Sequence, residues 1–393
     1  MTENYIQTKI SDERKFRLHF LDGMRGIAAF YVLLTHLWLY QGENLPPWIT
    51  IPTKFVRYGS FCVVVFIVLS GYCLMLPVAR SQAGYISGTL LDYFKRRARR
   101  IIPAYYAVIL FCCLLSLGIL ALERFTPFQW QTIDKDMFYP HFSIVDVFIH
   151  SLLIQNFATN TQTYMLNIPL WSVSLEWQIY FLFPLLFLPI RRRYGWISTI
   201  AIAFFLGLIP HYFFNGYMDV SHPWLMGSFT FGMLAAEITF SQAPFLIKLK
   251  NSLPWGQLSI VFAAIAIVTE WNKLGIAAWI YESIAGIAAA CLIIDCTKII
   301  VSERKKHIIL QILENTWVIK LSAFSYSWYL THAPVITLLR QLLTNLNMSP
   351  TAFAITLYAV GIIVSLAFAY VFYLTIEQAS YQKSKNWLTR TNH

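Results

Sequence analysis

A cation and a titratable ring share one face of a very apolar helix near the start of the chain. The stretch "LDGMRGIAAFYVLLTHL" spans residues 21–37 and contains Arg25 and His36. Their spacing makes about three helical turns, so both side chains point the same way, about 16 Å apart along the axis. Arginine suits phosphate groups, and histidine suits proton transfer near neutral pH. The pattern predicts a site for an elongated anionic ligand whose reactive end reaches His36. Alternatively, Arg25 is an interfacial anchor and His36 only joins two helices.

Two further ionisable residues lie inside apolar windows. Glu176 in "WSVSLEWQIYFLFP" lies about 10 Å from the external end of its window, and His332 in "FSYSWYLTHAPVITLL" lies about 18 Å from the cytoplasmic end. A buried carboxylate needs a partner, and an imidazole can supply one. We therefore expect His36, Glu176 and His332 to meet at similar depth, with Glu176 orienting His36. The alternative for each residue is an ordinary hydrogen bond between helices.

Two other segments interrupt the apolar pattern. In "YFKRRARRIIPAYY", a run of cations precedes an apolar window that we expect to begin near Pro103. The cations suit either membrane topology and lipid headgroups, or a diphosphate or nucleotide. In "VVFIVLSGYCLML", Ser70 and Gly71 predict either a close approach of two backbones or a break toward a cavity.

The composition places the chain in a membrane. Hydrophobic residues make up 57% of the chain, charged residues only 12%, and the mean hydropathy is +0.55. The fold class predicted is an all-α polytopic membrane protein with about ten transmembrane helices. We expect tails at residues 1–17 and 381–393 around a single transmembrane domain at residues 18–380. The windows are residues 20–40, 59–79, 101–122, 168–190, 194–213, 223–240, 256–271, 275–300, 320–343 and 352–376.

The distribution of charge predicts the orientation. A net charge of +11 would suggest nucleic acid as the partner of a soluble protein. Here most lysines and arginines fall in alternate connections, which by the positive-inside rule places both termini in the cytoplasm and predicts no nucleic-acid partner. The long external connection from Leu122 to Asn167 contains "SIVDVFIHSLLIQNF", which reads as a short amphipathic or re-entrant helix. No metal-binding spacing of His or Cys is visible, so no metal is expected.

Taken in order, these segments resemble the acyltransferase 3 family of integral membrane acyltransferases. The resemblance rests on "LDGMRGIAAFYVLLTH", "VFIVLSGY", "RRARRIIPAYY", "WSVSLEWQIYFLFP", "YSWYLTHAPV" and "TIEQASY", which run from Leu21 to Tyr381. It implies about ten helices and transfer of an acyl group, usually acetyl from acetyl-CoA, to a hydroxyl. The terminal motif departs from the family: Gln378-Ala379 follows Glu377 where Arg-Pro or Lys-Pro is common, which leaves the role of Glu377 open.

The resemblance also implies roles for particular residues. His36 matches the catalytic histidine and Arg25 its motif partner. Arg97 and Arg100 match the arginines on the coenzyme side, and Glu176 the acidic position. Residues expected to bind substrate or to support the site are His332, Asp22, Trp171, Ser174 and Tyr329.

The function expected is O-acyl transfer in the bacterial inner membrane. Cytoplasmic acetyl-CoA is the expected donor, and an extracytoplasmic glycan such as lipopolysaccharide O-antigen is the expected acceptor, by analogy with the family. His36 would act as a general base or carry the acyl group itself. The alternatives are another acceptor (peptidoglycan, a lipid or a small molecule) and a proton-coupled transporter of a lipid-linked glycan.

Overall fold

The computed structural model describes residues 18–81, 84–133, 136–158, 166–271 and 274–380. Both tails expected from the sequence lie outside these residues. Within the described part the chain is helical and contains no strand. The elements in chain order are α2 (His19–Tyr40), α3 (Pro47–Thr53), η1 (Lys54–Val56), α4 (Gly59–Arg80), α5 (Leu90–Phe125), α6 (Ile144–Ser151), η2 (Gln155–Phe157), α8 (Leu170–Leu182), η3 (Phe183–Phe187), α9 (Leu188–Phe213), η4 (Asp219–Ser221), α10 (Leu225–Phe240), α11 (Pro244–Ser252), α12 (Trp255–Thr269), α13 (Ala278–Val301), α14 (Ile308–Leu313), α15 (Thr316–Ser322), α16 (Ser325–Thr344), α17 (Pro350–Phe372) and η6 (Tyr373–Gln378).

Every apolar window predicted from the sequence overlaps a helix, and α6 occupies the amphipathic part of the external connection. In the described part of the chain, five helical stretches are long and apolar enough to cross a membrane, or six if α11 and α12, bent by 70°, form one span. The predicted spans α2, α10 and α16 are not among the five. α2 and α16 carry charged or titratable side chains that lower their hydropathy, and α10 has only 16 residues. Ten spans and cytoplasmic termini therefore stay predictions.

The basic segment is itself helical. The prediction that the helix begins near Pro103 was wrong: α5 begins at Leu90, where Thr89 and Asp92 form a capping box. That cap starts the helix three turns earlier and leaves Pro103 inside it. Since residues three apart are neighbours on a helix surface, Arg97 and Arg100 lie on one face of α5.

Two irregularities separate the predicted windows 168–190 and 194–213. The π-helical segment η3 joins α8 to α9, and Gly195 interrupts α9 with a φ of 80°. Only glycine adopts that conformation without strain, so the bend at Gly195 follows directly from the residue type. α8 is thereby free to take a different direction from the rest of α9.

α4 lies at the centre and packs against α10, α2 and α13. A Cβ placed on Gly71 would lie 2.0 Å from the Phe229 carbonyl oxygen, and one on Gly232 would lie 1.9 Å from the Val68 carbonyl oxygen. Glycine at both positions lets the two backbones touch, as small residues do in membrane helix pairs. The predicted close approach at Gly71 is confirmed. α4 continues through Ser70 without a break.

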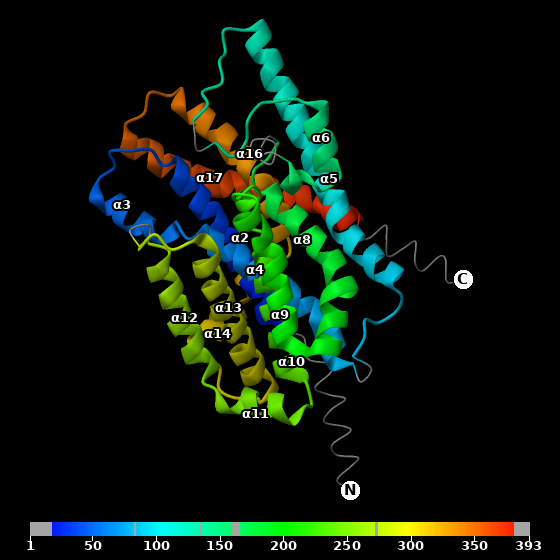
Figure 1. Ribbon diagram of the computed structural model, residues 1–393. Coiled ribbons are helices and arrows are strands. Elements are labelled where there is room, and N and C mark those ends of the chain that lie inside the picture. The colour runs from blue at the N-terminus through cyan, green and yellow to red at the C-terminus, as the bar shows by residue number, and fades with distance from the viewer. Residues whose placement is uncertain (1–17, 82–83, 134–135, 159–165, 272–273, 381–393) are drawn as a thin grey trace.

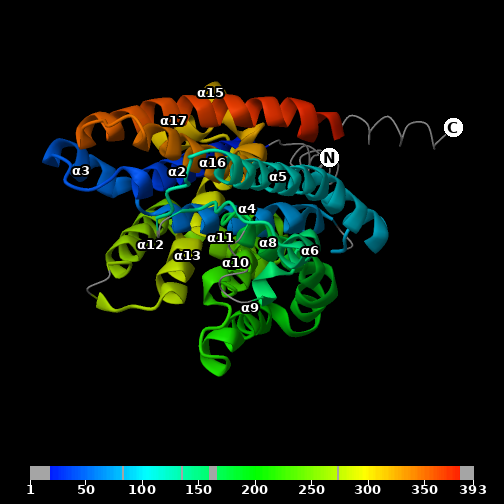
Figure 2. The ribbon, with the colours of Figure 1, turned by 90° about the horizontal axis from the view of Figure 1, so that it is seen from above.

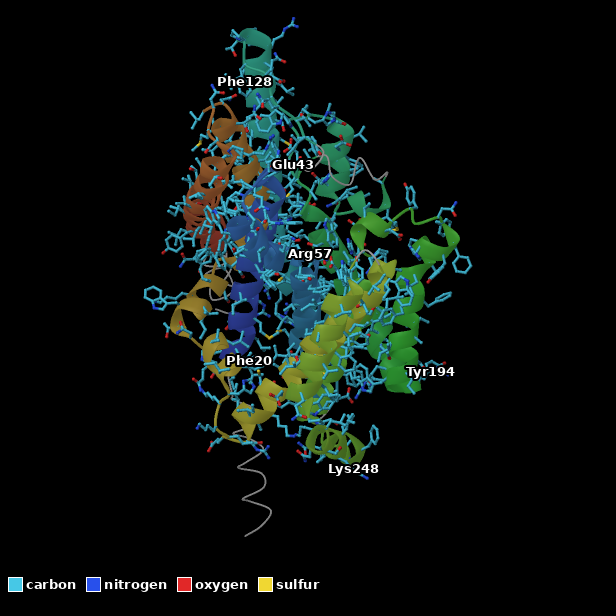
Figure 3. All side chains as sticks on the ribbon, turned by 90° about the vertical axis from the view of Figure 1, so that its left-hand side faces the viewer. Phe20, Glu43, Arg57, Phe128, Tyr194 and Lys248 are labelled. Carbon is cyan, nitrogen blue, oxygen red and sulfur yellow. The ribbon has the colours of Figure 1, made fainter. Side chains whose placement is uncertain are left out.

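The helices form layers around α4. Figure 2 shows α17 along one side, α9 on the opposite side, and α2, α16, α5 and α4 between them. Figure 1 shows that α8 descends beside α4. In Figure 3, Phe20 and Lys248 lie toward one end of the molecule, and Glu43 and Phe128 lie toward the other. α2 therefore runs from the end that carries Lys248 toward the end that carries the external connection.

Candidate active site

A cavity lies between α2, α4, α5, α8 and α16. Its volume, taken as the space open to the centre of a water-sized sphere, is about 80 Å³, which is more than a single ordered water needs. Its lining combines three arginines, one carboxylate, hydroxyl groups and apolar side chains. The lining residues are Arg25, Val63, Phe66, Ile67, Ser70, Cys73, Arg97, Arg100, Ser172, Val173, Glu176, Tyr180, Ser325, Tyr326 and Tyr329.

The arginines make this cavity positive. Arg25 Nη1 lies 3.1 Å from Asp22 Oδ1, and Arg25 Nη2 lies 2.9 Å from Cys73 Sγ. Arg97 lies over the rings of Tyr93 and Tyr180, with its carbon 5.9 and 5.8 Å from their centroids. The buried Arg97 Nε has no hydrogen-bond partner in the described part of the chain. The predicted coenzyme-side arginines and Arg25 therefore line one cavity and have donor capacity for an anion.

Glu176 also lines the cavity but does not contact His36. Its Oε1 accepts a hydrogen bond of 2.6 Å from the hydroxyl of Tyr180, one turn further along α8. Glu176 and Glu377 both interact electrostatically with Arg100. Glu377 in turn accepts a 2.6 Å hydrogen bond from Ser327. The expectation that Glu176 orients the His36 imidazole is therefore corrected: the carboxylate belongs to the arginine end of the site, where it partly balances Arg100.

His36 meets His332 instead. The distance between His36 Nδ1 and His332 Nε2 is 2.7 Å, and the two rings are nearly parallel, 4.8 Å apart at their centroids. His332 Nδ1 lies 3.1 Å from the Trp328 carbonyl oxygen. His332 is 1% exposed, whereas His36 is partly accessible. Of the three ionisable residues expected to meet, His36 and His332 are in contact where α2 packs against α16, and Glu176 does not join them.

Tyr329 connects the histidine pair to the cavity. Its ring lines the cavity and lies 5.8 Å from the His332 ring and 5.9 Å from the Phe66 ring. Its hydroxyl is 2.6 Å from the Ser172 hydroxyl. The histidines themselves are not among the lining residues, so the cavity ends against Tyr329, beside the pair.

The other expected supporting residues divide between two locations. Asp22 pairs with Arg25 at the cavity. Ser174 is fully buried and bonds the Leu170 carbonyl, and Trp171 stacks on His222, so neither lines the cavity. Sequence reasoning missed the lining residues Tyr180, Ser172, Cys73 and Tyr326. A signal existed for Tyr180, because a residue four places after a helical carboxylate lies on the same face.

A second histidine site lies around Trp171. His222 Nδ1 lies 2.9 Å from Glu282 Oε2, and the Trp224 indole donates a 2.6 Å hydrogen bond to the same oxygen. Trp171 and His222 stack with ring centroids 4.8 Å apart. Burial disfavours the charged imidazole, but Glu282 and then Asp219 outweigh it and raise the pKa of His222. We call these four residues, Trp171, His222, Trp224 and Glu282, the outer histidine cluster.

The connection from Leu122 to Asn167 packs against α2 and α16 one to two turns beyond the histidine pair. Arg340 Nη2 lies 3.3 Å from Asp136 and donates a 2.5 Å hydrogen bond to the Gln131 carbonyl. One turn beyond His36, the Tyr40 hydroxyl lies 2.8 Å from the Thr337 hydroxyl and accepts a 2.9 Å bond from the Met137 amide. Burial raises the pKa of Asp136, although Arg340 opposes the shift. Buried polar contacts thus join this connection to α2 and α16.

Among the residues that the structure describes, no group of three or more His, Cys, Asp or Glu side chains is arranged to hold a metal ion. The polar groups at the site are arginines, a carboxylate, hydroxyls and two imidazoles. These residue types can bind an anion and transfer a proton.

Comparison with known proteins places the chain among acyltransferases. The ORF330 protein of Acidianus two-tailed virus is 24% identical over 201 residues, which are 51% of this chain and 48% of that protein. The O-acetyltransferase OatA of Staphylococcus aureus is 25% identical over 189 residues, which are 48% of this chain and 28% of OatA. The matched regions thus cover less than half of each relative. No solved structure matches significantly.

A family model described as an acyltransferase domain matches residues 18–374, which include every residue of the cavity lining and both histidines of the pair. This match covers nearly the whole chain, and it agrees with the order of motifs in the sequence. The chain therefore belongs to the acyltransferase 3 family.

Proposed function

We propose that this protein transfers an acyl group, most simply acetyl, from cytoplasmic acyl-CoA to a hydroxyl of an extracytoplasmic glycan. The proposed location is the bacterial inner membrane, with ten spans and both termini in the cytoplasm. A surface polysaccharide such as lipopolysaccharide O-antigen is the proposed acceptor. The family, and a relative whose name is O-acetyltransferase, support acyl transfer. The distribution of lysines and arginines supports the orientation.

The observation that carries the proposal is the arginine-lined cavity that ends against Tyr329, beside the His36–His332 pair. Coenzyme A combines an anionic nucleotide with a long uncharged arm. Arg97 and Arg100 would bind phosphate oxygens, while the apolar lining from α4 would accommodate the arm. The thioester would then reach the histidine pair past the Tyr329 ring.

In the reaction, His36 would act as general base. The acceptor O–H gives its proton to His36 as its oxygen attacks the thioester carbonyl, which forms a C–O bond. The C–S bond then breaks, and the thiolate takes the proton from His36 to leave as free coenzyme A. The products are the acyl ester and the thiol, so no further reactant is needed. The acceptor would approach from the side covered by the external connection.

The test is release of free thiol. Protein purified in lipid nanodiscs is incubated with acetyl-CoA and, in separate reactions, with O-antigen polysaccharide, peptidoglycan fragments or lipid acceptors. We expect thiol release that depends on one acceptor, with a matching acetyl increment in the acceptor by mass spectrometry. Thiol release only with peptidoglycan fragments or only with lipid would show that this compound, and not O-antigen, is the acceptor. A transporter would release no thiol with any acceptor, and that result would overturn the proposal.

A further inference from the structure

The contacts of His332 determine which nitrogen of each ring carries hydrogen. A carbonyl oxygen only accepts hydrogen bonds, so the 3.1 Å contact with the Trp328 carbonyl requires hydrogen on His332 Nδ1. In a neutral imidazole the other nitrogen is then a bare acceptor. His332 Nε2 lies 2.7 Å from His36 Nδ1, so His36 Nδ1 must carry the hydrogen that bridges the two rings. The remaining nitrogen, His36 Nε2, is left without hydrogen.

We propose that His332 is the positioning residue of the reaction: it holds His36 in the tautomer whose Nε2 can accept a proton. This inference rests on the proposed function, because it assigns His332 a role in the same proton transfer. His332 takes the place that a carboxylate has in a Ser-His-Asp triad, where the third residue sets the tautomer and ring orientation of the base. Glu176 does not take this place in the structure: it lies at the arginine end of the site, where its Oε1 accepts a hydrogen bond from Tyr180.

The same contact stabilises the base once it is charged. When His36 Nε2 takes the acceptor proton, the hydrogen bond from His36 Nδ1 to His332 Nε2 becomes charge-assisted and therefore stronger. The nearly parallel rings at 4.8 Å keep both nitrogens in line for this bond. His332 is held in turn by the Trp328 carbonyl and by its position inside α16. A carboxylate in the place of His332 would add a negative charge that repels an anionic donor. The neutral imidazole of His332 adds no such charge.

Two substitutions of His332 separate the tautomer role from packing. His332→Gln places an amide oxygen near the position of Nε2, so it keeps an acceptor for His36. His332→Asn places its amide near Nδ1, so it keeps a bond to Trp328 but does not reach His36. We expect His332→Asn to lower kcat about 100-fold, and His332→Gln to retain activity within about tenfold of wild type. KM for acetyl-CoA should change less than about threefold in both, because the Arg97 and Arg100 contacts remain.

The measurement is thiol release with the acceptor that supports wild-type turnover, together with thermal unfolding of each variant. Equal activity of the two variants at equal thermal stability would overturn the inference. If either variant fails to fold, ¹⁵N NMR of the wild-type protein decides. His36 should then show a protonated Nδ1 and an unprotonated Nε2. Its signals are assigned as those that are absent from the spectrum of His36→Gln. The opposite tautomer would overturn the role of His332, whereas absent thiol release from wild type would overturn the proposed function instead.

Discussion

Two histidine sites lie beside consecutive residues of α8, Trp171 and Ser172. Their hydrogen-bond partners favour a neutral imidazole in one site and a charged imidazole in the other. Ser172 bonds Tyr329, which lies against His332, whereas the neighbouring Trp171 stacks on His222. His332 bonds a neutral imidazole and a carbonyl, while His222 bonds the carboxylate of Glu282, which is 1% exposed. Because the hydrogen-bonded groups His36, His332 and the Trp328 carbonyl are all uncharged, the His36 ring can accept a proton. A buried carboxylate favours the imidazolium and gives a stabilising ion pair instead.

The largest expected contrast comes from removing each ring. His36→Ala should lower kcat by about 1000-fold, because the general base is lost. His222→Ala should change kcat less than about threefold, since His222 does not line the cavity. Thiol release from both purified variants measures this. Comparable losses in both variants would mean that the outer histidine cluster takes part in the reaction.

The next largest effect concerns donor binding at the cavity. Arg100→Gln should raise KM for acetyl-CoA about 10–100-fold, because a charged hydrogen bond contributes about 1.5–3 kcal/mol. Lys95→Gln is the matched control: it removes the same charge from α5, but Lys95 is exposed and does not line the cavity. Initial rates against acetyl-CoA concentration measure both values. An equal rise in KM for Lys95→Gln would indicate a general surface charge effect and not a bound phosphate.

At the outer histidine cluster the effect should be on stability. Glu282→Gln removes the charge that His222 and Trp224 both contact, and we expect it to destabilise the fold by about 1–3 kcal/mol. Thermal unfolding in nanodiscs should therefore occur several degrees earlier, while kcat changes less than about threefold. Glu270→Gln, which removes a partly buried carboxylate paired with Arg57, serves as the comparison. A loss of activity without a loss of stability would instead indicate that Glu282 takes part in the reaction.

The smallest effect is the pH dependence of that stability. The folded-state pKa of His222 is raised above its usual 6.5, so the folded state binds the proton more tightly. The stabilisation is complete below about pH 6 and is lost as the pH rises through the raised pKa. We expect wild type to exceed His222→Gln by about 1 kcal/mol at low pH, with the difference disappearing at high pH. A difference that grows with pH would contradict the ion pair.

The positions of the helices could be predicted from the sequence more fully than the side-chain contacts between them. Apolar windows predicted the helices, because burial of backbone groups in lipid requires helical hydrogen bonding. The Arg25–His36 spacing also predicted a common helix face correctly. The partners of His36 were not predictable, because His332 and Glu176 fall at similar depths, and only the rotations of α8 and α16 decide which of them reaches α2.

Local signals misled in two places. Pro103 suggests a helix start, but the capping box at Thr89 begins α5 earlier and turns the basic run into one wall of the cavity. Glu282 and His222 carry no sequence pattern that links them, since His222 lies just before α10 and Glu282 lies near the start of α13. Their pairing depends on how α10 and α13 pack together, which the residue order does not specify.

The chain of hydrogen bonds from His36 ends at the main-chain oxygen of Trp328, and this has a consequence for the membrane. A peptide carbonyl can neither take up nor pass on a proton near neutral pH. The two rings can therefore hold one proton but cannot conduct it further along α16. Whatever proton arrives at Nε2 must depart from Nε2. The acyl transfer proposed above would therefore move no proton through the pair, and a proton gradient across the bilayer would stay intact.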